Sequence, residues 1–239
     1  MKKTQKNEPI FPETEIKEDH KPKLLKERLF DIYYEALPLF NLNIFWFLLS
    51  LPLVTFLPAL GGLYHAIQQY QRKQPANWQV FWDGFKENWL ASLKWGLIVL
   101  LGDLILAANI WFSLNIDAAW RIYTLSVGVM IAIIWIAINQ FSLPLLLLQK
   151  EKKIFLAIRN GYVIVVRQPW VALKTTLLCL LITILSILIP PLWFFIAMAL
   201  IAHLQTRAML RAVEKIRSQD TPDSPKDAGK SEEKDESRG

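Results

Sequence analysis

Three long apolar blocks constrain this chain more than any other feature of its sequence. They run from Trp95 to Leu114, from Ile122 to Leu148 and from Val171 to Ile189, and Lys174 is their only Lys or Arg. A soluble domain of this size would interleave polar residues with its apolar ones. At ~1.5 Å per residue, each block as a helix covers the ~30 Å hydrocarbon layer of a bilayer. The blocks therefore predict an all-α, polytopic membrane protein that is embedded in the lipid bilayer, its one expected lipid partner.

Two further apolar segments bring the expected number of spans to four or five. The apolar segments cover about residues 41–60, 95–114, 122–148, 171–189 and 190–204, within a single membrane domain over residues 23–217. The last of them is short for a span. The tails, residues 1–22 and 218–239, are polar and charged and are expected to be disordered.

The distribution of basic residues predicts the topology. The turn near residue 118 carries only Arg121 and the turn at Pro190 has no basic residue nearby, whereas five Lys and Arg fall within residues 149–170 and four within 207–217. Because Lys and Arg accumulate on the cytoplasmic side, we expect two transmembrane hairpins in a plasma membrane, with a cytoplasmic C-terminus. The net charge of +6 then reflects topology and anionic lipid, so no nucleic-acid partner is expected.

Amphipathic helices are expected at the membrane surface. Residues 23–40 have apolar positions near helical spacing. In FWDGFKENW, four aromatic residues from Phe81 to Trp89 fall on one helical face while Asp83, Lys86 and Glu87 face away. IFLAIRNGY, from Ile154, repeats this spacing. Each pattern predicts an interfacial helix.

The first apolar segment, NLNIFWFLLSLPLVTFLPAL, has two readings. It is long enough for one ordinary span, which would place the N-terminus outside. Pro52 and Pro58 instead favour a broken, partly re-entrant segment with the N-terminus inside, because each proline lacks a backbone donor. The basic residues on either side nearly balance, so both readings stay open, with the broken form slightly favoured.

Asp103 is the only acidic residue well inside one of the three long apolar blocks. Counted from the inner ends of their blocks, Asp103 and Asn139 lie at the same depth of about 13 Å, with Gln140 beside Asn139. We expect Asp103 to hydrogen-bond one of these amides, since a carboxylate in lipid is costly unless paired or protonated. The cluster would serve as a polar clamp of the hairpin or as a proton or substrate relay.

Other reactive residues give no site. Cys179 is the only cysteine and is expected to be a packing residue. His65 and His203 lack further ligands for a metal pair. No phosphate loop, HExxH, paired-Cys or GxSxG motif occurs in the sequence. We therefore expect no metal, no cofactor and no enzymatic activity, although an intramembrane enzyme needs few residues.

The first apolar segment and FWDGFKENW carry a family pattern. It comprises an Asn, a Trp, Leu-Pro-x-x-Thr, a Pro-Ala-x-x-x-Leu-Tyr run and Phe-Lys-x-Asn, which here are Asn41 or Asn43, Trp46, Leu51, Pro52, Thr55, Pro58, Ala59, Leu63, Tyr64, Phe85, Lys86 and Asn88. Over residues 41–95 the chain resembles the YesL-like family of bacterial integral membrane proteins, a domain of unknown function. Leu57 replaces the family's Gly before the second proline.

The resemblance implies an accessory role in carbohydrate uptake, since such proteins often accompany carbohydrate ABC transporters. The partner would be an ABC permease subunit. A small transporter or channel that uses the broken segment and Asp103 is the alternative.

Overall fold

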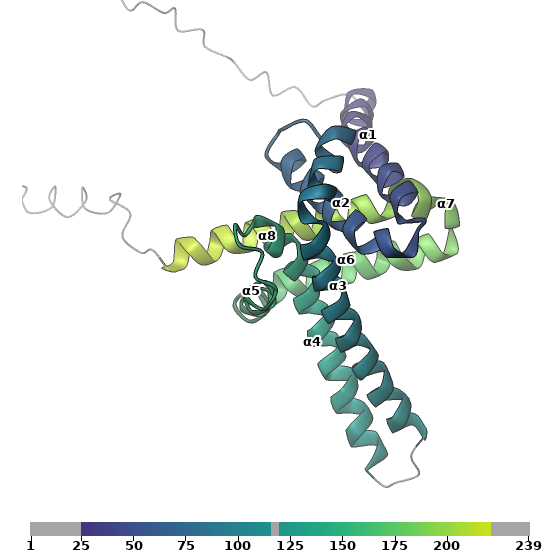
Figure 1. Ribbon diagram of the computed structural model, residues 1–239, viewed down its shortest axis with the longest axis vertical. Helices are drawn as coiled ribbons and strands as arrows, with labels where there is room; N and C mark the ends of the chain where they lie inside the picture. Colours follow the sequence, from purple (N-terminus) through teal and green to yellow (C-terminus); the bar gives the residue numbers. More distant parts are fainter. Residues whose placement is uncertain (1–24, 116–119, 221–239) are drawn as a thin grey trace, which may run out of the picture. The chain divides into compact units, whose positions relative to one another are not determined.

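The computed structural model describes the backbone of residues 25–115 and 120–220, and side chains from Ala36 onward within these ranges. Every regular element in the described residues is helical, which confirms the all-α prediction. The elements are α1 Leu25–Ser50, η1 Leu53–Thr55, α2 Phe56–Gln71, α3 Trp78–Asn115, α4 Arg121–Leu148, α5 Ile154–Arg167, α6 Pro169–Leu188, α7 Pro190–Leu192, η2 Trp193–Ala197 and α8 Met198–Asp220 (Figure 1). The chain divides into two units, Met1–Glu35 and Ala36–Gly239, and the description below concerns the second.

Four stretches of helix are long and apolar enough to cross a membrane: α3, α4, α6 and the continuous run Pro190–Asp220. Ala36–Ser50 is a shorter apolar helix. This agrees with the expected four or five spans. The helix that contains the end of the fifth apolar segment continues past Leu204 for 16 residues to Asp220. Ser218 to Asp220, assigned to a disordered tail from the sequence, are therefore helical, and the rest of that tail and residues 1–22 lie outside the described residues.

The chain reverses direction between α1 and α2. Phe45 of α1 packs its ring edge-on against Trp78, at the start of α3. Gly62 of α2 lies at the same level, since a Cβ there would be 2.9 Å from the carbonyl oxygen of Phe81. Phe45 and Gly62 are each eight or nine residues from Leu53, so α1 and α2 form the two sides of a hairpin whose tip is η1. The predicted break is present, and the backbone turns back at it.

The two predicted helices flanking the first segment are not separate elements. The expected surface helix over residues 23–40 belongs to α1, which continues to Ser50. The FWDGFKENW helix is the first part of α3. Its charged residues face outward as predicted, but Phe81 and Phe85 are buried against α2 and not left for lipid. The glycines of α2 allow α3 to approach closely. The spacing of apolar residues within α3 cannot predict this contact, because it depends on the sequence of α2.

The outer parts of α3 and α4 form what we call the arm, residues 97–115 and 120–138. Each of these two helical segments is about 28 Å long, close to the ~30 Å thickness of the hydrocarbon layer. Large apolar side chains are exposed along both helices, among them Leu101, Ile105, Ile122, Met130 and Ile133. Figure 1 shows α6 and α8 crossing α3 and α4 near the inner end of the arm and not running beside it. The arm's apolar surface is therefore left for lipid or for another protein.

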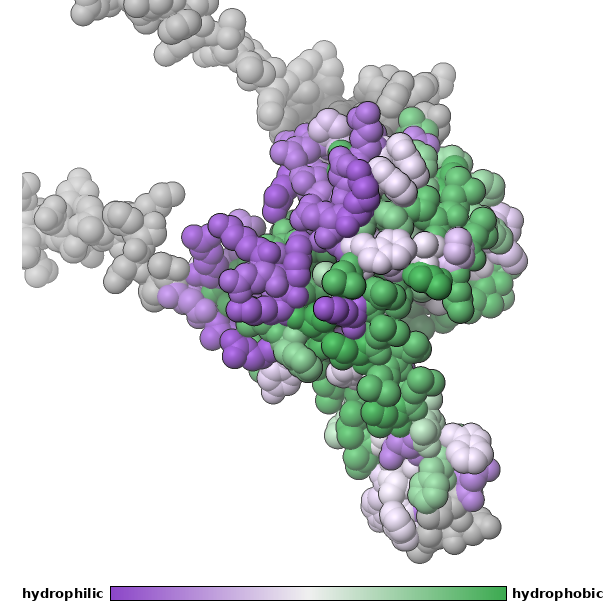
Figure 2. Space-filling model, in the orientation of Figure 1, coloured by the Kyte–Doolittle hydropathy of each residue, from purple (hydrophilic) through white to green (hydrophobic). Residues whose placement is uncertain are grey.

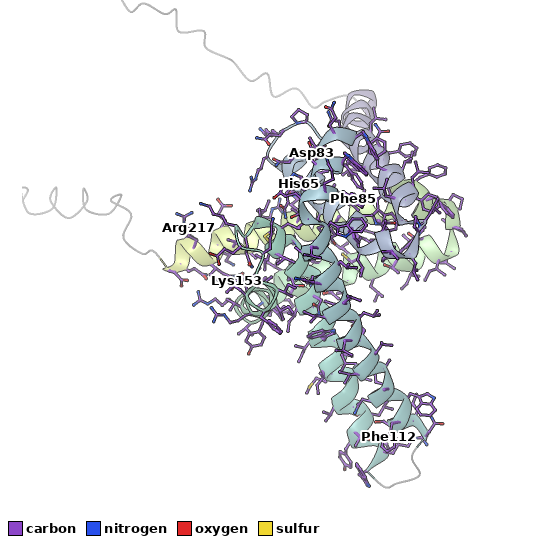
Figure 3. All side chains as sticks on the ribbon, viewed as in Figure 1. His65, Asp83, Phe85, Phe112, Lys153 and Arg217 are labelled. Atoms are coloured by element: carbon purple, nitrogen blue, oxygen red, sulfur yellow. The ribbon has the colours of Figure 1, made fainter. Side chains whose placement is uncertain are left out.

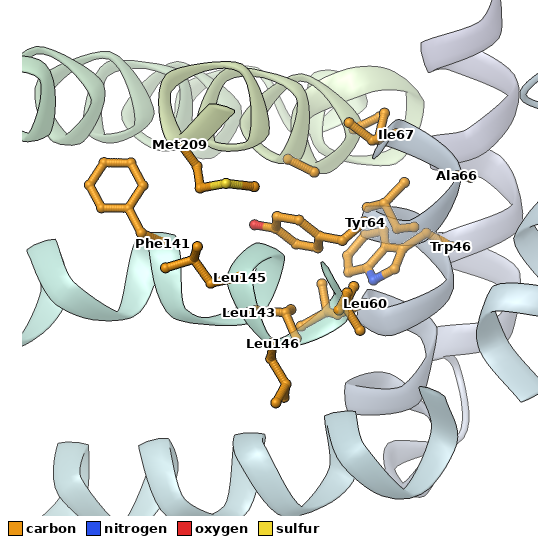
Figure 4. Packing of buried hydrophobic residues seen from close by; sticks show 14 of the residues in the cluster. Trp46, Leu60, Tyr64, Ala66, Ile67, Phe141, Leu143, Leu145, Leu146 and Met209 are labelled. Atoms are coloured by element: carbon orange, nitrogen blue, oxygen red, sulfur yellow. The ribbon is translucent and has the colours of Figure 1, made fainter. Parts of the chain in front are cut away.

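The core lies at the inner end of the arm, where α1, α2, α4 and α8 meet. Figure 4 shows Tyr64 with Leu143 and Leu145 of α4 on one side and Met209 of α8 on the other. Trp46 of α1 is also in this cluster and is only 1% exposed. The core thus gathers residues from both ends of the chain, and it fixes the position of the residues described next.

Candidate functional site

The break between α1 and α2 is held by Thr55. Its hydroxyl oxygen lies 2.5 Å from the carbonyl oxygen of Leu49 and 2.7 Å from that of Pro52, and its backbone N–H donates to Pro52 at 3.0 Å. Carbonyl groups at the end of a helix have no partner within it. The Thr55 hydroxyl pairs with the Leu49 carbonyl at the end of α1, and its backbone N–H pairs with the Pro52 carbonyl in the turn. The tip nonetheless exposes apolar side chains, and Leu53 is 90% exposed. Exposing these apolar side chains to water costs free energy, so the tip is more stable in an apolar environment.

Asn43 connects α1 to the irregular start of the last long helix. Its side-chain amide donates to the carbonyl oxygens of Trp193 at 3.0 Å and Phe194 at 2.7 Å. Its oxygen accepts the backbone N–H of Ala199 at 2.9 Å. The π-helix η2 departs from the i→i+4 pattern, and Asn43 satisfies the backbone groups around it. Asn43 is fully buried, so these three bonds are part of the core.

Trp46, one turn further along α1, packs on the same region. Its ring lies edge-on to Phe56 and to Trp193, with centroid distances of 5.9 and 6.1 Å. The family-pattern residues Asn43, Trp46, Pro52 and Thr55 therefore converge on the α1–α2 turn and η2. Pro58 is buried at the start of α2.

A polar stripe on α2 contacts α4 and α8. The Tyr64 hydroxyl donates to Gln205 Oε1. Gln68 donates to the carbonyl oxygen of Pro144 at 2.8 Å, and Gln71 donates to that of His203 at 2.9 Å. Sequence reasoning missed both glutamines, although their i, i+4, i+7 spacing from Tyr64 on an apolar helix was the available signal.

The adjoining face of α2 packs closely on α3. A Cβ at Gly61 would meet the Ser92 hydroxyl, and a Cβ at Gly84 would lie 2.6 Å from His65 Cβ. Asn88, fully buried in this interface, donates to the Gly84 carbonyl at 2.8 Å. The remaining pattern residues thus lie in the contacts of α2 with its neighbours: Tyr64 of α2 bonds α8, and Phe85 and Asn88 of α3 pack against α2.

The predicted cluster of Asp103, Asn139 and Gln140 does not form. Trp135 Nε1 donates to Asp103 Oδ1 at 2.9 Å instead. Asn139 donates to the Trp135 carbonyl at 2.9 Å, and Gln140 donates to Thr176 Oγ1 at 2.9 Å on α6. The error lies in counting depth from the inner ends of the blocks. Near the inner end Trp95 Nε1 donates to Ser142 Oγ at 2.8 Å, so Ser142, and not Leu148, lies opposite the start of the block at Trp95. In this register Asp103 lies beside Trp135.

Asp103 lies on the exposed surface of the arm. It is the only acidic residue in the arm. Leu100, one turn away on the same side of α3, and the adjacent Leu104 are apolar and exposed. Trp135 supplies one donor, whereas a carboxylate accepts about four hydrogen bonds. The arrangement leaves a carboxylate with free acceptor capacity in the middle of an apolar surface.

The two histidines do not form a metal site in the described residues, where no group of three His, Cys, Asp or Glu side chains gathers. Burial lowers the pKa of His65, and Lys152 and Arg72 add to this effect while Glu87 and Asp83 oppose it. His203 lies against the ring of Tyr70, 5.9 Å between centroids.

The fold and these contacts define the class of the protein: an α-helical integral membrane protein with a broken first apolar segment. Residues 39–110 match the model of a family described as a protein of unknown function, DUF624. The matched stretch contains the α1–α2 hairpin and most of α3, together with every residue of the pattern identified from the sequence. Comparison with curated proteins gave no match, and comparison with solved structures gave none either.

Proposed function

We propose that this protein is an accessory subunit that binds a transport protein in the plasma membrane through the arm formed by α3 and α4. The observation that carries the proposal is the exposed carboxylate of Asp103 on the apolar surface of that arm. The other features of the arm are those of any lipid-facing helix pair.

If lipid covers the arm, placing the Asp103 side chain at this position costs free energy. Translocon-based scales give about 2.5 to 3.5 kcal/mol for an aspartate at the centre of a spanning helix. The indole of Trp135 offsets part of this cost. A partner helix with Lys, Arg or another donor at the same depth offsets more, because charge-assisted hydrogen bonds are stronger than neutral ones. Asp103 therefore favours a protein partner with a polar group inside the membrane.

The arm points away from the charged side of the molecule. Figure 2 shows hydrophobic surface on the middle of the arm, pale and hydrophilic residues at its tip, and a large hydrophilic patch on the part of the body away from the tip. Figure 3 places Phe112 at the arm's tip, far from Asp83, Lys153 and Arg217. We assign the basic side, with the C-terminus, to the cytoplasm by the positive-inside rule. The exposed rings of Trp111 and Trp120 then lie at the outer interface.

The choice of partner rests on the resemblance to the YesL-like family. That resemblance, over residues 41–95, lies within the DUF624 match over residues 39–110 and implies an association with carbohydrate ABC transporters. The proposed partner is therefore a permease subunit of such a system, with a basic or donor side chain at mid-membrane depth.

Co-purification tests the proposal. The full chain, tagged at its C-terminus, is extracted from the native host in a mild detergent, as wild type, Asp103→Asn and Asp103→Glu. We expect a permease in near-stoichiometric amount with the wild type and Asp103→Glu, and at least tenfold less with the neutral Asp103→Asn. Recovery of the protein alone, from an extract in which known membrane complexes survive, would contradict the proposal. Solute flux by the purified protein in liposomes would favour the transporter alternative.

A further inference from the structure

A pocket of about 290 Å³ lies between α6 and α8, and three basic side chains line it. Lys174 comes from α6, and Arg207 and Arg211 come from α8. The two arginines are one turn apart on one face of their helix, so both point toward the same groove. Nothing in the proposed function uses this pocket, which is built from helices outside the arm.

The three charges have no acidic partner among the described residues. Other basic residues do have one: Lys86 pairs with Asp83 at 3.2 Å, and Arg167 pairs with Asp220 at 2.7 Å. Three cations around one pocket repel each other, and an anion between them removes that repulsion. The positive-inside rule explains basic residues at the inner ends of spans, but it does not require three of them to line one pocket.

The pocket is apolar toward its other end. Leu178 of α6 and Leu204 of α8 line it beyond the basic residues. Since α6 and α8 are antiparallel, the basic residues gather at one end and the leucines at the other. Exposed apolar residues continue along the same face of α6 at Leu181 and Leu185. The groove is therefore charged where it meets the interface and apolar where it enters the membrane.

We propose that this pocket binds the phosphodiester headgroup of an anionic phospholipid, with an acyl chain along Leu178 and Leu204. A guanidinium presents paired N–H donors that match the oxygens of a phosphate. Basic pockets between spanning helices on the cytoplasmic side bind anionic headgroups in this way. A lipid fits both ends of the groove, whereas free phosphate uses only the charged end.

The test uses the purified full chain in nanodiscs with phosphatidylcholine, to which phosphatidylglycerol is added in steps. Lipid enrichment around the protein is read by native mass spectrometry. Arg207→Gln combined with Arg211→Gln removes two charges from the pocket. Arg72→Gln combined with Arg159→Gln is the matched control, because it removes two exposed arginines outside the pocket. Size-exclusion profiles confirm that each variant is folded.

The wild type and the control should retain phosphatidylglycerol over phosphatidylcholine. The pocket variant should bind it roughly 25-fold more weakly, at about fivefold per removed charge. Equal loss in both double variants would overturn the site, because general surface charge would then explain binding. Equal retention of both lipids by the wild type would also overturn it. So would displacement of the lipid by millimolar inorganic phosphate, which would identify a site for free anions.

Discussion

Trp135 Nε1 donates a hydrogen bond to Asp103 Oδ1 at 2.9 Å, and this bond joins the two helices of the arm. A double-mutant cycle with Trp135→Phe and Asp103→Leu should give a coupling energy of about 0.6 kcal/mol, the average for side-chain bonds inside membranes. Unfolding in mixed micelles measures it. A coupling energy indistinguishable from zero would show that the bond does not stabilise the arm.

Asn43 should be among the most sensitive polar positions in the core. Asn43→Leu removes two donors from carbonyl groups of η2 and one acceptor from a backbone N–H of α8. Each buried group left unpaired costs about 1–3 kcal/mol, so the free energy of unfolding should fall by about 3 kcal/mol or more. Asn115→Leu is the control, because Asn115 is exposed and bonds only the nearby Trp111 carbonyl. Similar small losses for both variants would refute the role given to Asn43.

The close contact of α2 with α3 predicts two different outcomes for neighbouring glycines. Gly61→Ala meets the Ser92 hydroxyl, whereas Gly62→Ala meets the Phe81 backbone carbonyl. Each should destabilise the protein by about 1–3 kcal/mol through overpacking. Ser92→Ala should restore part of the loss for Gly61→Ala and none for Gly62→Ala, as measured by thermal unfolding in detergent. Rescue of both, or of neither, would contradict the described packing.

His65 should make stability depend on pH. Its pKa in the folded protein is lowered, first by burial, while Glu87 and Asp83 act in the opposite sense to Lys152 and Arg72. The unfolded chain therefore takes up the proton first as pH falls, and stability is lost from about pH 6.5 downward. Above about pH 7.5 the histidine is neutral in both states. Melting temperatures at pH 7.5 and 5.5 should differ less for His65→Gln than for the wild type; an unchanged difference would remove His65 as the cause.

The reversal of the chain between α1 and α2 predicts that both termini lie on one side. Reporter domains fused to the N-terminus and to the C-terminus should both be protected in intact cells and exposed after permeabilisation. A cysteine at Asn115, introduced in a Cys179→Ser background that lacks other cysteines, should be labelled from outside. An externally accessible N-terminal reporter would show that residues 41–60 cross the membrane once.

Helix positions and the break were predictable from the sequence, and the contacts between helices were not. The apolar blocks located α3, α4 and α6 because helix length and bilayer thickness are linked. Pro52 indicated the break, because a proline lacks a backbone donor. The predicted partner of Asp103 was wrong because it depends on the register of α3 against α4, which contacts such as the bond between Trp95 and Ser142 reveal. The bonds of Asn43 to Trp193 and Phe194 could not be predicted from the sequence, because they join residues that are 150 and 151 positions apart.

Site-specific photocrosslinking beside Asp103 tests the proposed partner binding most directly. A photoreactive amino acid at Leu104, exposed next to Asp103 on the arm, is compared with one at Ile187, which is exposed on α6. In native cells we expect Leu104 to crosslink to one permease-like membrane protein, with Asp103→Asn abolishing the product, and Ile187 to give no such product. Only lipid adducts at Leu104, in the same pattern as at Ile187, would contradict the account.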